Sequence, residues 1–241
     1  MKIYSKTDIG MRRKVNQDAF YTGEFDNGAV FAVVCDGMGG ANGGDFASQK
    51  ASTVISNYVK RSYSPKMNST AIENLLRAAV DSANTEIHDL AQTDETYKGM
   101  GTTAVVVFVI DNLAHIVHVG DSRAYFISNN EIEQITVDHS VVEAMVRNGE
   151  ISAEQAKTHP QKNVITRALG AKETVMCDYN IVLKPDSTAI LICTDGLTNF
   201  VDEQNILEAV KTSAPEVCVE KLIDMANNAG GADNITAVLI Y

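Results

Sequence analysis

The sequence predicts an α+β protein, a four-layer α-β-β-α sandwich with two central antiparallel β-sheets flanked by helix pairs. Its predicted elements are segregated into strands, two helices, strands, short helices, strands, two helices and a final strand, without regular strand–helix alternation. Some strands are continuous apolar runs, such as AVFAVVCD at residues 29–36, which is typical of burial on both faces. About ten strands and two pairs of long helices fit two stacked sheets, each covered by a helical layer.

The first half of the chain begins with short strands at residues 2–5 and 19–22, followed by the apolar strand 29–36. Apolar residues then recur at helical spacing, which predicts helices at residues 45–61 and 70–92.

The second half begins with a β-rich stretch bounded by polar turns, which predicts strands at residues 102–110, 114–119, 123–128 and 131–136. The remaining elements are, in order, strands 176–183 and 188–194, helices 202–212 and 215–228, and strand 234–241.

Residues 138–170 form a polar, irregular stretch, interrupted at Gly149, Pro160 and Gly170. Its mixed polarity fits a mobile flap, and it equally fits two packed surface helices. Both interpretations remain open at this point.

Composition limits the partners and location of the protein. The formal net charge of −11 gives nucleic acid no electrostatic help, so we expect no such partner. The cysteines form no CxxC pair, and the chain opens without the apolar core of a signal peptide. The longest apolar stretch, residues 104–110, is too short to span a membrane. We expect a cytoplasmic monomer with one domain over residues 1–241, without membrane insertion.

Five aspartates mark the ends or entries of predicted strands. Asp36 and Asp195 each end an apolar run at an Asp-Gly pair, which is also a common turn dipeptide. Asp18, Asp121 and Asp233 adjoin other strands. If sheet packing gathered these carboxylates, they would repel each other and raise their own pKa values, which divalent cations with oxygen ligands would relieve. The five glycines among residues 37–44 would let a carbonyl or phosphate approach the backbone closely.

These residues carry a resemblance to a known family. The blocks RRKVNQD, CDGMGGANGGDFAS, GMGTTAVVV, VGDSRAY, TDGL and GGADNIT occur in the order seen in metal-dependent Ser/Thr protein phosphatases of the PPM (PP2C-like) family. The chain resembles the compact bacterial members from residue 3 to residue 241. The family fold is a β-sandwich of two antiparallel sheets flanked by helix pairs, which agrees with the layers expected above.

The resemblance implies a binuclear Mn²⁺ or Mg²⁺ site at one end of the sandwich. Asp36 would bridge the two ions, and the carbonyl of Gly37 would bind the first. Asp195 and Asp233 would complete the second, and Asp18 would hold water molecules of the first ion.

The resemblance also implies direct hydrolysis of phosphoserine and phosphothreonine. Asp121, sharing Asp195, would hold a third, weaker ion. A metal-bridging hydroxide would attack phosphorus without a phospho-enzyme intermediate. Arg13 would bind the phosphate through its planar donor fork, with the adjacent Arg12 as the alternative.

Other reactive side chains have structural interpretations. His115 and His118 point to opposite faces of a strand, so we expect neither to be a ligand. Cys35 and Cys193 lie on apolar strands, where core packing is their expected role. Many bacterial relatives carry histidine, a candidate proton donor, where this chain has Ala41. We therefore hypothesise that metal-bound water near Asp121 protonates the leaving group.

Two functions compete on this fold. The first is an active phosphatase acting on phosphorylated proteins, a Ser/Thr kinase and its targets among them by family analogy. The second is a non-catalytic regulatory module. A pseudo-enzyme is expected to lose a metal carboxylate, yet all the expected ones are present in this sequence.

Overall fold

The structure is a computed structural model that describes residues 1–128 and 130–241, without the side chains of residues 40–42. Its strands are β1 (Ile3–Asp8), β2 (Asp18–Glu24), β3 (Val30–Met38), β4 (Gly101–Thr102), β5 (Ala104–Ile110), β6 (Leu113–Val119), β7 (Arg123–Ile127), β8 (Ile132–Gln134), β9 (Asp178–Leu183), β10 (Ala189–Cys193) and β11 (Ile235–Ile240). Its helices are α1 (Gly40–Ser62), α2 (Ser69–Thr93), the 3₁₀ helix η1 (Glu95–Tyr97), α3 (Val141–Arg147), α4 (Ala153–Thr158), α5 (Asp195–Thr198), α6 (Glu203–Thr212) and α7 (Pro215–Asn228).

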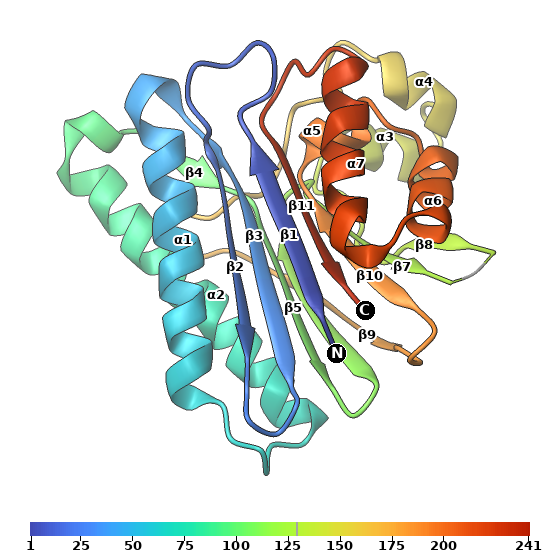
Figure 1. Ribbon diagram of the computed structural model, residues 1–241. Helices are drawn as coiled ribbons and strands as arrows, with labels where there is room; N and C mark the ends of the chain where they lie inside the picture. The colour runs from blue at the N-terminus through green and yellow to red at the C-terminus, as the bar shows by residue number, and fades with distance from the viewer. Residues whose placement is uncertain (129) are drawn as a thin grey trace.

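The predicted α+β class and four-layer sandwich are confirmed. One sheet has the strand order β1-β11-β10-β7-β8, and the other has β2-β3-β5-β6-β9, with β4 paired to the end of β3. Neighbouring strands in both sheets are antiparallel. Helices α1 and α2 cover the second sheet, and α6 and α7 cover the first (Figure 1).

Alternation along the central strands builds the hydrophobic layers. On β3, Phe31 and Val33 pack towards α1 and α2, whereas Ala32 and Val34 pack in the layer between the sheets. Strand β5 alternates in the same way. Because successive side chains point to opposite faces, a strand buried on both sides must be apolar at every position. Cys35 and Cys193 are fully buried in the two helix–sheet layers, so their predicted packing role is confirmed.

Two elements of the glycine-rich segment have boundaries that differ from the sequence prediction. Strand β3 continues through Asp36 to Met38, because Gly37 pairs with Thr102 of β4. Helix α1 begins at residue 40, and its N-cap Gly39 adopts φ +113°, a conformation that favours glycine. The Asp36-Gly37 pair is therefore extended strand. The second Asp-Gly pair, from Asp195, opens helix α5, so the turn interpretation is wrong at both places.

Residues 138–170 form the short helices α3 and α4, neither of which has a buried residue. Isolated β-bridges between Ser140 and Ile165 and between Thr102 and Leu169 anchor the segment to itself and to β4. The segment therefore carries two surface helices, and its role as a mobile flap stays a prediction. Among the helices of the described residues, none is both long and apolar enough to cross a membrane.

Candidate active site

Two of the predicted site aspartates lie opposite each other on neighbouring strands. The antiparallel register of β2 and β3 pairs Asp18 with Asp36, and such pairs lie about 4.5–5.5 Å apart at Cβ. The GMGTT segment fixes the backbone of Asp36. Thr102 Oγ1 donates to the carbonyl of Asp36 (2.8 Å), and the N–H of Asp36 donates to Thr103 Oγ1 (2.9 Å). The carboxylate of Asp36 therefore projects from a firmly held strand.

Asp18 is the buried member of the pair. Its Oδ2 accepts hydrogen bonds from the hydroxyls of Thr194 (2.9 Å) and Thr236 (2.7 Å), whereas its buried Oδ1 has no hydrogen-bond partner in the structure. Burial raises the pKa of Asp18 to about 7, and the charges of Asp195 and Asp233 add to this while the threonine hydrogen bonds oppose it. A buried carboxylate oxygen without a donor is unfavourable unless a cation or water meets it.

Asp195 and Asp233 come from the other sheet. Asp195 follows β10 and Asp233 precedes β11, and these strands are antiparallel neighbours, so both residues lie at the same end of the sheet. Asn199 Nδ2 donates to Asp195 Oδ2 (3.0 Å). Burial raises the pKa of Asp195, and the charge of Asp233 raises it further, against hydrogen bonds from Asn199 and Asp36.

Asp121 lies in the bend between β6 and β7. Burial raises its pKa to about 7, and the charges of Asp195 and Asp138 act in the same direction. The next residue, Ser122, makes a hydroxyl–hydroxyl hydrogen bond to Thr103 (2.8 Å), the residue that holds the backbone of Asp36. The GDSR and GMGTT segments are thus joined directly.

The structure brings the predicted aspartates into one electrostatic cluster. Burial raises the pKa of Asp36 well above its ordinary value, and four like charges raise it further, those of Asp18, Asp195, Asp121 and Asp233. Residues from positions 18 to 233 and from both sheets therefore act on a single carboxylate. Their role as metal ligands remains a prediction.

Gly37 sits where no larger residue fits. A Cβ added to it would lie 1.9 Å from the carbonyl oxygen of Gly44 and 2.6 Å from that of Gln17. Its N–H donates to the Gln17 carbonyl (3.0 Å). The backbone here is bare because three chain segments meet at van der Waals distance.

Arg13 is the arginine of the RRK segment that reaches the cluster. Its Nη2 donates to Asp233 Oδ2 (2.8 Å). That hydrogen bond raises the pKa of Arg13, and the charges of Asp233, Asp36 and Asp195 also raise it, against partial burial. The guanidinium of Arg13 therefore lies beside the aspartate cluster and contacts it through Asp233.

A groove of about 670 Å³ separates the flap from the segment that follows α5. Val142 and Val146 of α3 line one side, and Phe200 and Val201 line the other. Asn199, the partner of Asp195, also lines it. The groove therefore reaches a hydrogen-bond partner of Asp195, but none of the five candidate aspartates is among its lining residues.

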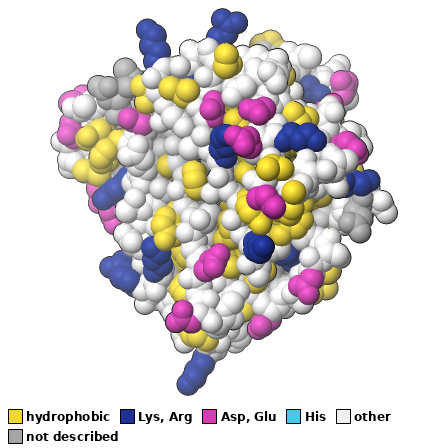
Figure 2. All heavy atoms as spheres, in the orientation of Figure 1, with side chains coloured by type: hydrophobic (Ala, Val, Ile, Leu, Met, Phe, Trp, Pro, Cys, Tyr) yellow, Lys and Arg dark blue, Asp and Glu magenta, His cyan; other side chains and the backbone are white. Residues whose placement is uncertain are grey.

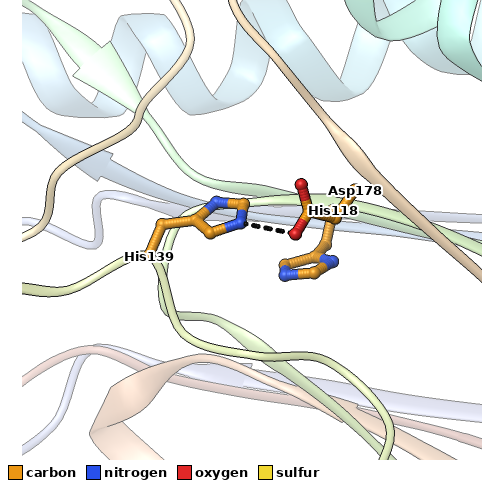
Figure 3. A group of neighbouring side chains, drawn as sticks. All are labelled: His118, His139 and Asp178. Atoms are coloured by element: carbon orange, nitrogen blue, oxygen red, sulfur yellow. Dashed lines mark ion pairs between the residues drawn. The ribbon is translucent and has the colours of Figure 1, made fainter. Parts of the chain in front are cut away.

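A second polar cluster was not predicted from the sequence, which assigned a structural role to one of its members, His118. It consists of His118, His139 and Asp178, whose possible ligand atoms lie within 4.8 Å of one another (Figure 3). His139 Nε2 lies 3.3 Å from Asp178 Oδ2, and Arg167 Nη1 lies 2.8 Å from Asp178 Oδ1. These residues are far apart in the sequence, and neither their types nor their spacing form a recognisable motif.

Hydrogen bonding in this second cluster favours a structural role. His139 Nδ1 accepts the N–H of Gly120 (3.1 Å), and its Nε2 faces both Arg167 Nη1 (3.0 Å) and Asp178 Oδ2 (3.3 Å). His118 Nε2 bonds the carbonyl of Val137 (2.9 Å). The Arg167 guanidinium already supplies a positive charge. The cluster therefore ties the base of the flap to β6 and β9.

The aspartate cluster, by contrast, fits divalent cations. Its donors are carboxylate oxygens and a backbone carbonyl, the ligands that Mg²⁺ and Mn²⁺ prefer. Its carboxylates raise each other's pKa, and Asp18 Oδ1 is buried without a partner. These are the features expected of a site in which positive charge is supplied by bound ions.

Comparisons with known proteins agree with the fold and the cluster. The family model described as protein phosphatase 2C matches residues 11–235. The protein phosphatase PhpP of Streptococcus pneumoniae is 37% identical over 243 residues, covering 100% of this chain and 97% of that protein. The crystal structure of serine/threonine phosphatase Stp1 from Staphylococcus aureus has a TM-score of 0.92 and 34% identity, covering 99% of this chain and 93% of that one. The catalytic domain of the serine/threonine phosphatase PstP, in complex with two manganese ions, has a TM-score of 0.86 and 29% identity, covering 99% and 96%.

The two-sheet sandwich and the similarity to these relatives together identify a protein phosphatase. The chain belongs to the protein phosphatase 2C family. It is a hydrolase and a protein phosphatase, and the family resemblance expected from the sequence is confirmed.

Proposed function

We propose that the chain hydrolyses phosphoserine and phosphothreonine in proteins, as one catalytic domain over residues 1–241. Asp36, the Gly37 carbonyl, Asp195 and Asp233 would hold two Mn²⁺ or Mg²⁺ ions, and Asp18 would orient water beside them. When bound, such ions generate a nucleophile from water at neutral pH and offset phosphoryl charge. The observation that supports this proposal is the acidic cluster, in which the buried Oδ1 of Asp18 has no hydrogen-bond partner.

Arg13 would bind the phosphoryl oxygens of the substrate. Its side chain is about half exposed and contacts the cluster through Asp233, so it can exchange that contact for a phosphate without crossing the core. A planar guanidinium also matches the geometry of phosphate oxygens. Its role is to hold the substrate against the carboxylates that would otherwise repel it.

Asp121 would serve the third, weaker ion together with Asp195, and it would also support proton delivery. Water held by that ion beside Asp121 would supply the proton to the leaving group. The side chain of Ala41 lies outside the described residues, so the effect of lacking a histidine there stays a hypothesis.

The partners follow from the family. The relatives are named protein or serine/threonine phosphatases, which supports phosphorylated proteins as substrates. We propose, as before, a bacterial signalling role opposite a Ser/Thr kinase, a cytoplasmic location and a monomer. The groove beside the flap offers room for the polypeptide around the phosphorylated residue.

The test is hydrolysis of a phosphothreonine peptide and of p-nitrophenyl phosphate with Mn²⁺ and then with EDTA. We expect metal-dependent release of phosphate that Asp36→Asn abolishes. The matched control is Asp26→Asn, which removes an exposed aspartate in the turn between β2 and β3, at the opposite end of these strands from Asp18 and Asp36. No metal-dependent release by the folded wild-type protein would favour the non-catalytic regulatory module.

A further inference from the structure

The side chain of Asn234 makes three hydrogen bonds to one stretch of chain. Its Nδ2 donates to the carbonyls of Ile9 (2.9 Å) and Val15 (3.0 Å), and its Oδ1 accepts the N–H of Gln17 (2.8 Å). Asn234 is only 3% exposed. A single buried amide therefore joins both ends of the connection between β1 and β2.

The segment between these ends, residues 9–15, carries Arg13 and is otherwise weakly held. Residues 11–15 are exposed, Met11 by 67% and Val15 by 46%. The connection between β1 and β2 lies at the top of Figure 1, and Lys or Arg side chains project from the same edge in Figure 2. Within the described residues, its other main-chain hydrogen bonds are from the Met11 N–H to the Gly231 carbonyl (2.7 Å) and from the Gly10 N–H to Asp8 Oδ1 (2.8 Å).

Asn234 also lies between the two halves of the candidate site. Its neighbour Asp233 accepts the hydrogen bond from Arg13. The Gln17 peptide that bonds Asn234 through its N–H accepts the N–H of Gly37 through its carbonyl (3.0 Å). One amide thus connects the arginine segment, the backbone of Gly37 and the strand entry at Asp233.

We propose that Asn234 is a positioning residue that fixes the segment of residues 9–15, so that Arg13 meets the phosphate of the substrate. This inference rests on the proposed function for the role of Arg13. The side chain of Asn234 touches neither substrate nor reacting atoms in this scheme. It acts by restricting the segment that carries the guanidinium.

The amide chemistry explains why asparagine is suited to this position. It offers two donors to two carbonyls and one acceptor to an N–H, which matches the groups that face it. Aspartate would place an oxygen against the carbonyls of Ile9 and Val15. Alanine would leave all three main-chain groups without their partner, and such buried groups are costly.

The structure supplies a matched control in Asn84, which is 2% exposed. Its Nδ2 donates to the carbonyls of Lys172 (3.1 Å) and Glu173 (3.0 Å), and its Oδ1 accepts the N–H of Gly170 (2.8 Å). Asn84 therefore holds a different loop by the same three bonds. Replacing Asn84 therefore tests the effect of losing three such hydrogen bonds at a loop that does not carry Arg13.

The first measurement is limited trypsin digestion of the metal-free protein, because residues 12–14 are all trypsin sites. We expect Asn234→Ala to be cut there about tenfold faster than wild type, and Asn84→Ala to be cut there at the wild-type rate. An unchanged rate in Asn234→Ala overturns the inference. Activity plays no part in this measurement, so its result is separate from the fate of the proposed function.

The second measurement is peptide hydrolysis with Mn²⁺ and its inhibition by inorganic phosphate. We expect Asn234→Ala to raise KM and to weaken phosphate inhibition about tenfold, with little change in kcat. The reason is that phosphate binding would be weakened equally in the bound substrate and in the transition state. Asn84→Ala should keep the wild-type KM. In an Arg13→Ala background, Asn234→Ala should add no further loss, and a full additional loss would contradict the inference.

A final measurement covers the case in which Asn234→Ala does not fold. Asn234→Ser keeps one donor and should show an intermediate cleavage rate. In wild type, the Gln17 amide should exchange with deuterium as slowly as neighbouring strand amides. Fast exchange at Gln17 would show that the clamp does not hold, which overturns the proposal.

Discussion

The aspartate cluster and the His118–His139–Asp178 cluster differ in what balances the charge of their carboxylates. In the first, burial raises the pKa of Asp18 to about 7, and the like charges of Asp195 and Asp233 add to this. In the second, hydrogen bonds from His139 and Arg167 lower the pKa of Asp178 despite its partial burial. A site that needs an external cation shows raised carboxylate pKa values, whereas a structural tie carries its own counter-charge.

The largest effect should come from removing a charge in the aspartate cluster. Asp36→Asn keeps the shape of the side chain, and we expect metal-dependent hydrolysis to fall at least about 100-fold. In the absence of metal, the same change relieves repulsion, so at pH 8 its melting temperature should rise by roughly 2–4 °C. Calorimetry and steady-state kinetics on one preparation measure both effects. A variant that loses activity and also loses stability would contradict the electrostatic interpretation.

The pH dependence of stability tests the same cluster. The pKa values of Asp18 and Asp121 are raised to about 7, so between pH 4 and 7 the folded state binds protons that the unfolded state has released. Stability of the metal-free protein should therefore fall as pH rises through this range, by roughly 5–10 °C in melting temperature between pH 5 and 8. Thermal unfolding in EDTA measures this.

Saturating Mn²⁺ should remove or reverse that slope, because bound cations favour the ionised carboxylates. A metal-free protein that gains stability from pH 5 to pH 8 would refute the idea that burial and neighbouring charges raise the pKa values of these carboxylates.

The smallest effect should come from the second cluster. Asp178→Asn removes the partner of Arg167 and of His139, but the carboxylate is 43% exposed and solvent screens the pair. We expect a loss of at most about 1 kcal/mol in unfolding free energy, with kcat retained within about threefold. Chemical denaturation and kinetics would measure this, and a loss of activity as large as that of Asp36→Asn would make this cluster part of the catalytic site.

The sequence predicted the residues of the aspartate cluster better than the surrounding structure that holds them in place. Asp36 and Asp195 were visible because each follows an apolar strand, and strand ends are easy to locate. The grouping at one end needed the sheet order, which came from the family resemblance. His139 and Asp178 were not found, because their contact depends on where the flap returns to the sheet. The extension of β3 past Asp36 was missed because glycines favour no single backbone conformation.

Asp18 has a consequence for the molecule as a whole. It belongs to one sheet, while the threonine hydroxyls that hold it belong to the end of β10 and to β11 in the other. The acidic end of the sandwich therefore also joins its two sheets by hydrogen bonds. Removal of metal by a chelator should weaken this connection and increase hydrogen exchange along β2 and β11 together. Substitutions that weaken the same hydrogen bonds would impair both folding and turnover.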